Sequence, residues 1–268
     1  DAYIYSRYGN PTVSLFEQRL AALEGTERCV AVSSGMAAMH AALACRLQAG
    51  DHLVASKALF GSCLQVITTL LPRYGISYTL VDGTDLAAWE SAITTHTKVF
   101  FCETPANPTL ALVDVAAVGK IAKAAGITFV VDNAFASPAV QRATPRGADV
   151  ITYSATKHID GQGRCMGGAV CCSEQFYTDH LQDFVRHTGP SLSPFNAWTL
   201  AKALETLDLR VSRMADNALN IAEHLEGHDA IDRVSYPGLR SHPQREIASR
   251  QMRNGGTLPA THGARANA

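Results

Sequence analysis

The sequence lacks several features that would assign it to a class at once. Its formal net charge is −1, with 23 lysines and arginines against 24 aspartates and glutamates, so we expect no basic footprint for nucleic acid and no acidic tail. No apolar run reaches the roughly 18–20 residues that cross a bilayer, so we expect no membrane contact. The seven cysteines are scattered and form no C-x-x-C pair. This usage is typical of a reduced, cytoplasmic chain rather than a disulfide framework.

Common binding motifs are also missing. Neither a Walker A sequence nor H-E-x-x-H occurs, and "GQGRCMG" differs from G-x-G-x-x-G because it follows no strand directly and opens no clear helix. His224 and His228 lie four residues apart near a helix end, but no third ligand accompanies them. A solvated helix end therefore explains them better than a metal site, and we expect no metal.

Short apolar runs rich in β-branched residues alternate with amphipathic stretches up to Ser193. The apolar runs span residues 28–34, 52–56, 76–82, 98–103, 127–133, 149–154 and 168–173. This order predicts an α/β fold with a mainly parallel, seven-stranded sheet and helices on both faces.

The pattern changes after Ser193. Residues 193–227 read as one long helix or two that abut, beginning after the Ser193-Pro194 signal. The segment 231–238 is one more candidate strand, whereas the closing "TLPATHGARANA" has no strand or helix period. With its start at Asp1 instead of methionine, the chain is expected to be a fragment of a longer one.

Ligands of open parallel sheets bind beyond the carboxyl ends of strands, and several residues there could bind one. "SSGMAA", at 33–38, leads a strand into a helix whose free N–H groups can bind a phosphate, although an ordinary tight turn would look the same. Asp132 ends an apolar strand. It either caps a turn or is a site carboxylate, which would need a cationic partner if buried.

Lys157 follows the strand at 149–154, close to Ser154 and Thr156. A lysine amine in a partly apolar pocket can attack carbonyl groups, whereas a lone lysine is usually solvated. Glycines permit the close approach of a ligand to the backbone, and they stand nearby at 161, 163, 167 and 168. They favour a functional role for Lys157.

Ser154 and Lys157 also form S-x-x-K, the nucleophile signature of penicillin-recognising serine enzymes, and "HTG" at 187–189 loosely resembles their K-T-G. That serine should begin a helix, but "HIDGQGRCMGG" is poor helix material, and no S-D-N lies between the two motifs. A serine nucleophile is therefore a disfavoured alternative.

Taken together, six segments resemble the transsulfuration, or Cys/Met-metabolism, family of pyridoxal-phosphate enzymes. They are "YSRYGNPT", "SSGMAA", "LFGS", "ETPANP", "VVDNAFASP" and "YSATKHIDGQG", in the family's order and at its approximate spacing. "GPSLSPFNAW" and "VSYPGLRSHPQ" extend the likeness to about Gln244. "HIDGQGRCMGG", and Phe60 where lyases and cystathionine synthases usually carry tyrosine, are most similar to O-succinylhomoserine sulfhydrylases.

The resemblance implies the large-domain fold of fold type I pyridoxal-phosphate transferases and assigns roles around the cofactor ring. Lys157 would hold pyridoxal 5'-phosphate as a Schiff base, and Asp132 would pair with the ring nitrogen, which keeps the ring an electron sink. Phe60 would stack on the ring. Glu103 and Asn107 would lie near the cofactor.

The resemblance also implies a phosphate site. Backbone N–H groups and hydroxyls would bind the phosphate, from Gly35, Met36, Ser154 and Thr156. Tyr5 and Arg7 would reach it from a neighbouring subunit, since an arginine fork matches a phosphate. A dimer would then complete each site, and family members are usually tetramers.

The implied activity is a γ-replacement in methionine biosynthesis, in which O-succinylhomoserine and sulfide give homocysteine and succinate. Cystathionine γ-synthase and γ-lyase activities are alternatives within the family. The implied domains are the remnant of an N-terminal arm (1–18), a cofactor-binding large domain (19–205) and an incomplete C-terminal domain (206–268). The family's substrate-clamping arginine has no match here, so a catalytically incompetent fragment that keeps the cofactor-binding fold is a further alternative.

Overall fold

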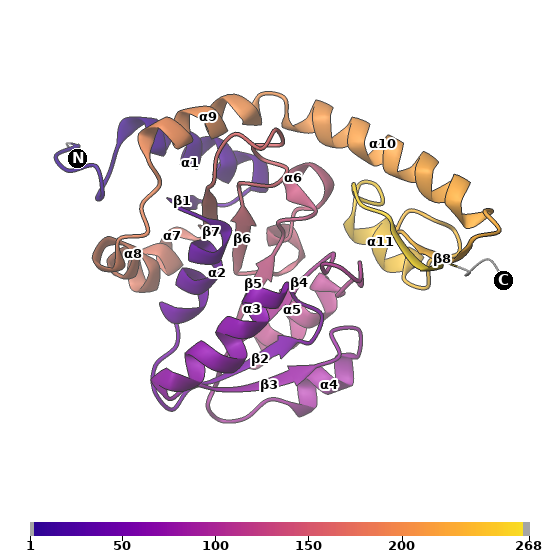
Figure 1. Ribbon diagram of the computed structural model, residues 1–268. Coiled ribbons are helices and arrows are strands. Elements are labelled where there is room, and N and C mark those ends of the chain that lie inside the picture. Colours follow the sequence, from indigo (N-terminus) through magenta and orange to yellow (C-terminus); the bar gives the residue numbers. More distant parts are fainter. Residues whose placement is uncertain (1–2, 265–268) are drawn as a thin grey trace.

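The computed structural model describes residues 3–264, which contain a seven-stranded sheet and a two-stranded one (Figure 1). The large sheet has the order β1-β7-β6-β5-β4-β2-β3. Its strands are β1 (Arg28–Val32), β2 (His52–Ser56), β3 (Ser77–Val81), β4 (Thr97–Glu103), β5 (Thr128–Asp132), β6 (Val150–Ser154) and β7 (Gly168–Cys172). Strands β6, β5, β4, β2 and β3 are parallel, and β7 is antiparallel to both neighbours. The predicted seven-stranded, mainly parallel sheet is confirmed.

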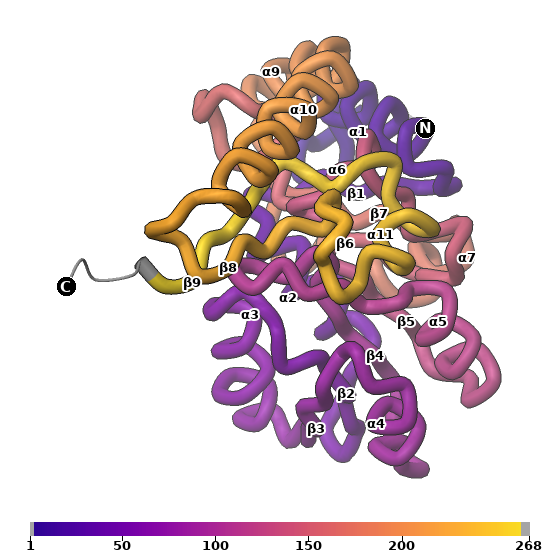
Figure 2. The backbone as a smooth tube through the Cα atoms, turned by 90° about the vertical axis from the view of Figure 1, so that its right-hand side faces the viewer, coloured from indigo at the N-terminus to yellow at the C-terminus, as the bar shows by residue number. Residues whose placement is uncertain are grey.

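Helices cover both faces of this sheet, and the described part of the chain begins and ends on opposite sides of the molecule (Figures 1 and 2). The helices are α1 (Pro11–Glu24), α2 (Gly35–Ala44), α3 (Gly61–Gln65), α4 (Leu86–Ser91), α5 (Val115–Ala124), α6 (Ser137–Val140), α7 (Glu174–Phe176), α8 (Gln182–Thr188), α9 (Pro194–Leu204), α10 (Leu207–Glu226) and α11 (Arg245–Gln251). Single turns of π- or 3₁₀-helix are η1 (Val66–Leu70), η2 (Leu71–Tyr74), η3 (Thr144–Arg146) and η4 (Tyr177–Leu181).

Each face of the sheet has its own apolar core because alternate strand residues point to opposite faces. One core packs α1, α5 and α9 against residues such as Phe100, Phe129 and Ile151. The other packs α2 and the turn η1 against Phe101 and Val130. We call these the α1 face and the α2 face.

Side-chain caps fix where several helices begin. Asn10 accepts the N–H groups of Thr12 and Val13 at the start of α1, and Ser193 accepts that of Asn196 at the start of α9. A cap of this kind satisfies an N–H group that has no partner within the helix. The predicted helical stretch after Ser193 is indeed two helices, α9 and α10, which abut.

The small sheet corrects one sequence-based expectation. Strand β8 (Ile231–Ser235) was expected, but the closing segment was not, and there β9 (Ala260–Ala264) pairs antiparallel with β8. Strand β9 is defined by its backbone hydrogen bonds to β8. Along residues 260–263 no buried side chains alternate with exposed ones, so the sequence shows no strand period. Residues 265–268 of the segment lie outside the described residues.

None of the helices described is both long and apolar enough to cross a membrane. The break between α9 and α10 falls at the predicted boundary 205/206. The domain boundaries, like the cytoplasmic location, stay predictions.

Candidate active site

The carboxyl ends of the parallel strands bring three polar side chains into one row. Glu103 on β4 lies opposite Asp132 on β5, and Asp132 lies opposite Thr152 on β6. Residues opposite one another in neighbouring strands point to the same face. These three side chains therefore share the α2 face, where Val130 and Val150 of the same strands are buried.

Glu103 connects this row to two of the predicted near-cofactor residues. Its side chain is buried, and its two carboxylate oxygens accept the N–H of Phe60 at 2.6 Å and that of Asn107 at 3.1 Å. Phe60 directly precedes α3, and 44% of its surface is exposed. A single carboxylate thus holds the loop that presents the Phe60 ring and the turn that carries Asn107.

The beginning of α2 lies against the end of β6. Ser34 caps α2 by accepting the N–H of Ala37 at 3.1 Å. A Cβ atom on Gly35 would lie 2.6 Å from Cβ of Ser154, so only glycine allows this approach. First-turn N–H groups, such as those of Gly35 and Met36, have no acceptor within the helix. Beside the Ser154 hydroxyl they form a cradle suited to an anion.

Replacing Gly35 with alanine should damage this cradle. The added methyl group would displace Ser154 or the start of α2, at a cost of roughly 1–3 kcal/mol in the free energy of unfolding. Affinity for pyridoxal phosphate should fall more than affinity for pyridoxal, which lacks the phosphate. Gly227→Ala is the matched control, because no atom of the described residues lies within 4 Å of a Cβ there. Equal losses for both ligands would contradict the phosphate assignment.

Lys157 is exposed in the turn that follows β6. Its N–H donates to the carbonyl of Ser154 at 3.1 Å, and the N–H of Gly161 donates to its own carbonyl at 2.7 Å. Ser154 is thus the last residue of a strand, with Lys157 in a turn rather than one helical turn further on. The serine-nucleophile alternative, which needs a helix, is wrong.

A side chain of α10 anchors the turn that carries Lys157. Arg210 donates to the carbonyl of His158 at 2.9 Å and to that of Ile159 at 3.0 Å. A Cβ on Gly161 would lie 1.7 Å from Nη1 of Arg210. Any side chain at position 161 would therefore clash with Arg210. This contact explains the glycine more specifically than the expected approach of a ligand.

Two hydroxyl groups near Lys157 differ from expectation. The Thr156 hydroxyl accepts the N–H of Gly167 at 3.1 Å and donates to its carbonyl at 3.3 Å, so it already has partners. Thr152, which the sequence reasoning missed, has a buried Oγ1 without a hydrogen-bond partner in the described part of the chain. Its position two residues before Ser154 in a strand was the signal that could have identified it.

The unsatisfied groups on the α2 face fit the predicted cofactor. Asp132 accepts the N–H of Ala134 at 3.0 Å, and no ion pair within residues 3–264 involves it. A half-buried carboxylate without a cation and a buried hydroxyl without a partner are both unfavourable. A cationic ring nitrogen with polar substituents would satisfy both.

Burial makes this pair of carboxyls hard to ionise. It raises the pKa of Asp132 to about 6. Burial first, and the charge of Asp132 second, raise the pKa of Glu103 to about 8. Two such neighbours titrate together, and near neutrality they retain a proton between them. A cation bound beside Asp132 would favour its ionised form.

The stability of the cofactor-free chain should therefore fall as the pH rises from about 4.5 to about 8. The folded chain binds these protons more tightly than the unfolded chain, so folding becomes less favourable as they are lost. In Glu103→Gln the free energy of unfolding should decrease less between pH 5 and pH 8, by roughly 1–3 kcal/mol, than in the wild type. Urea unfolding of both proteins at several pH values measures this, and parallel curves would contradict it.

The structure does not bring Tyr5 and Arg7 to this site. The guanidinium of Arg7 donates to the carbonyl of Arg186 and lies over the rings of Tyr5 and Tyr8, with Cζ 5.1 and 4.7 Å from their centroids. These residues line a cavity of about 570 Å³ beside α8, which neither Lys157 nor Asp132 lines. Within one chain, the arm and the lysine are separate.

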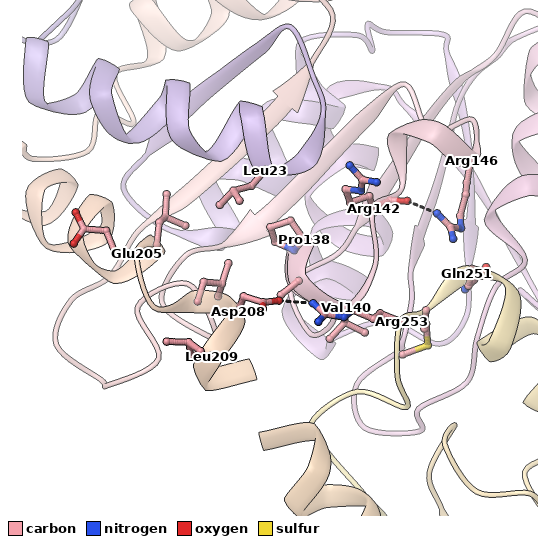
Figure 3. Close-up of a pocket in the computed structure, with 14 residues that line it drawn as sticks. Leu23, Pro138, Val140, Arg142, Arg146, Glu205, Asp208, Leu209, Gln251 and Arg253 are labelled. Atoms are coloured by element: carbon pink, nitrogen blue, oxygen red, sulfur yellow. Dashed lines mark hydrogen bonds and ion pairs between the residues drawn. The ribbon is translucent and has the colours of Figure 1, made fainter. Parts of the chain in front are cut away.

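A second cavity of about 570 Å³ also lies away from the site (Figure 3). It opens between α6, the start of α10 and the segment after α11, and its lining includes Pro138, Asp208 and Arg253. None of the predicted site residues lines it.

The histidine pair near the end of α10 has no third metal-binding side chain beside it in the described residues. The rings of His224 and His228 are 6.5 Å apart, and the residues described hold no cluster of three metal-binding side chains.

Comparisons with known proteins identify the family of this chain. The family model "Cys/Met metabolism PLP-dependent enzyme" matches residues 1–261. The chain is 52% identical over 258 residues to the O-succinylhomoserine sulfhydrylase of Mycobacterium tuberculosis, and 39% identical over 263 residues to the L-methionine γ-lyase of Treponema denticola. These alignments cover 96% and 97% of this chain, but only 64% and 66% of the relatives.

A solved structure extends the agreement to the fold. The crystal structure of metB from Corynebacterium glutamicum superimposes with a TM-score of 0.96 at 38% sequence identity, over 98% of this chain and 69% of that one. The family match spans nearly the whole chain, and the fold is shared at substantial identity. The chain therefore belongs to the family of pyridoxal-phosphate-dependent enzymes of cysteine and methionine metabolism.

Proposed function

We propose that this chain is the cofactor-binding part of a γ-replacement enzyme that converts O-succinylhomoserine and sulfide to homocysteine and succinate. The observation that carries the proposal is the 52% identity to an O-succinylhomoserine sulfhydrylase, against 39% to a methionine γ-lyase. Cystathionine γ-synthase and γ-lyase activities remain the alternatives of the same family.

The row of polar groups on the α2 face would hold the cofactor. Lys157 would bind it covalently, Asp132 would face the ring nitrogen and Phe60 would cover one face of the ring. The phosphate would lie at the start of α2, beside the hydroxyl of Ser154. Thr156 would contribute only if its hydroxyl turned away from Gly167.

Bound pyridoxal phosphate supplies an electron sink for charge that develops on the substrate carbon. The Lys157 amine would take the proton from Cα and return it at the end of the reaction, since it lies in the turn beside the cradle. Phe60 has no ionisable group, so it would orient the ring but move no proton. Sulfide would form the new bond at Cγ, the bond from Cγ to the succinyl oxygen would break, and succinate would leave.

Tyr5 and Arg7 would act in a neighbouring subunit. Among residues 3–264, the guanidinium of Arg7 contacts a carbonyl and two tyrosine rings, and it would match a phosphate bidentately. We therefore propose a dimer as the smallest complete unit, a tetramer as the assembly, and the domain ranges 1–18, 19–205 and 206–268.

An assay with O-succinylhomoserine and sulfide, after loading with pyridoxal phosphate, tests the proposal. We expect homocysteine and succinate in equal amounts, with O-acetylhomoserine and cysteine as competing donor and acceptor. Cystathionine from cysteine would favour the γ-synthase alternative, and release of a keto acid without sulfide would favour the lyase. A chain that binds the cofactor but makes no product would favour the incompetent fragment.

A further inference from the structure

A residue next to each of three site residues points to the opposite face of the sheet. Thr104 follows Glu103 and Asn133 follows Asp132 at the ends of β4 and β5, while Tyr153 precedes Ser154 on β6. Because side chains alternate along a strand, these neighbours lie on the α1 face, directly behind the site. Tyr153 belongs to the core on that face.

These neighbours are tied together by a buried polar network. The Asn133 amide donates to the Tyr153 hydroxyl at 2.8 Å and to the carbonyl of Gln141 at 2.7 Å. The Gln141 amide donates to the carbonyl of Thr104 at 3.0 Å and to the Asn133 amide oxygen at 2.9 Å. The ends of β4, β5 and β6 are thus linked by side chains, in addition to the strand ladder.

Glu24, at the last turn of α1, completes the network. Its side chain is fully buried, and its carboxylate accepts the Tyr153 hydroxyl. It also accepts the N–H groups of Ala143 at 2.8 Å and Thr144 at 3.3 Å. Burial, followed by the charge of Glu24, raises the pKa of Tyr153 well above its usual range, so this hydroxyl remains a donor. The direction of every bond from Glu24 to Thr104 is therefore fixed.

We propose that Glu24, Tyr153 and Asn133 are positioning residues for the cofactor site. They act from the face of the sheet opposite the cofactor, and they fix the strand ends that present Asp132 and Ser154. Buried side chains that hydrogen bond to one another hold each other in one arrangement, and within the described residues Oε1 of Gln141 is the one side-chain oxygen of these groups without a partner. The inference rests on the proposed function, because it concerns how that site is held.

Two variants remove the network with little change in shape. Tyr153→Phe deletes one hydroxyl, which leaves a buried carboxylate oxygen and an amide without their shared partner. Glu24→Gln keeps the side-chain volume but replaces an acceptor oxygen with a donor NH₂ group. Both should weaken equilibrium binding of pyridoxal phosphate about tenfold. In the double variant the two losses should not add, because the residues share one interaction.

Trp89→Phe is the matched control for a purely structural effect. Trp89 is also a fully buried aromatic residue that makes one hydrogen bond, from Nε1 to the carbonyl of Gly83 at 3.2 Å. It lies on α4, at the far end of the molecule from α9 and α10 (Figure 2). This variant should lower the melting temperature of the cofactor-free chain but leave its affinity for pyridoxal phosphate unchanged.

Titration of each cofactor-free protein with pyridoxal phosphate, followed by visible absorbance, separates the outcomes, with melting temperatures measured in parallel. Weaker binding by Tyr153→Phe than by Trp89→Phe at equal loss of stability supports the inference. Equal affinity of these two variants overturns it while leaving the proposed function intact. A wild-type chain that binds no pyridoxal phosphate overturns the proposed function itself, and this inference with it.

Discussion

Replacing Lys157 with alanine should reduce product formation by about 10³-fold or more while leaving the fold intact. The Lys157 side chain is exposed, and only its backbone takes part in the turn, through the hydrogen bonds with Ser154 and Gly161. Loss of the amine therefore removes covalent attachment and proton transfer together. The free energy of unfolding should change by less than about 0.5 kcal/mol, as for other exposed positions.

Lys120→Ala is the control for the loss of one exposed positive charge. Lys120 lies on α5, away from the carboxyl ends of the strands, and is also exposed. Steady-state rates, circular dichroism and the visible absorbance of the bound cofactor should be measured for both variants. If Lys157→Ala kept more than a tenth of the wild-type rate, Lys157 would not be the catalytic lysine.

Replacing Asp132 with asparagine should lower the rate by about 10²–10³-fold, because the charge opposite the ring nitrogen is lost. The amide oxygen can still accept the N–H of Ala134, so the turn after β5 should survive. The cofactor-free variant should even be more stable than the wild type above pH 6. Desolvation raises the pKa of Asp132 to about 6, and asparagine avoids the cost of ionising this carboxyl at higher pH.

Asp149→Asn is a matched carboxyl-to-amide change outside the site. Asp149 also accepts one backbone N–H, that of Phe129 at 2.8 Å, but it lies just before β6, at the opposite edge of the sheet from Asp132. The rate of product formation by Asp149→Asn should equal that of the wild type. A normal rate in Asp132→Asn would remove Asp132 from its assigned role, and no gain of stability above pH 6 in that variant would contradict the raised pKa of Asp132.

Much of the fold could be predicted because strands and helices leave clear periods in the sequence. The seven apolar runs became the seven strands of the large sheet, and Ser193 caps α9 where a helix was expected to begin. Part of the site could be predicted because Asp132 and Ser154 end strands, whereas Glu103 was expected only from the family resemblance and Thr152 was missed. Carboxyl ends of parallel strands meet at one edge whatever the intervening sequence.

Other features depend on contacts between distant residues and leave no local pattern. Strand β9 exists through its pairing with β8, and the anchor from Arg210 to the carbonyl of His158 joins positions 52 residues apart. The network from Glu24 through Tyr153 likewise joins α1 to β6. The place of Arg7 in a complete site depends on a second chain, which no local pattern specifies.

Covalent trapping tests the central claim most directly. The chain should be loaded with pyridoxal phosphate, treated with borohydride, digested and mapped by mass spectrometry. We predict a single cofactor adduct, carried by the peptide that contains Lys157, and no adduct in Lys157→Ala. An adduct on a different lysine, or none in a folded chain at saturating cofactor, would contradict the assignment of this site.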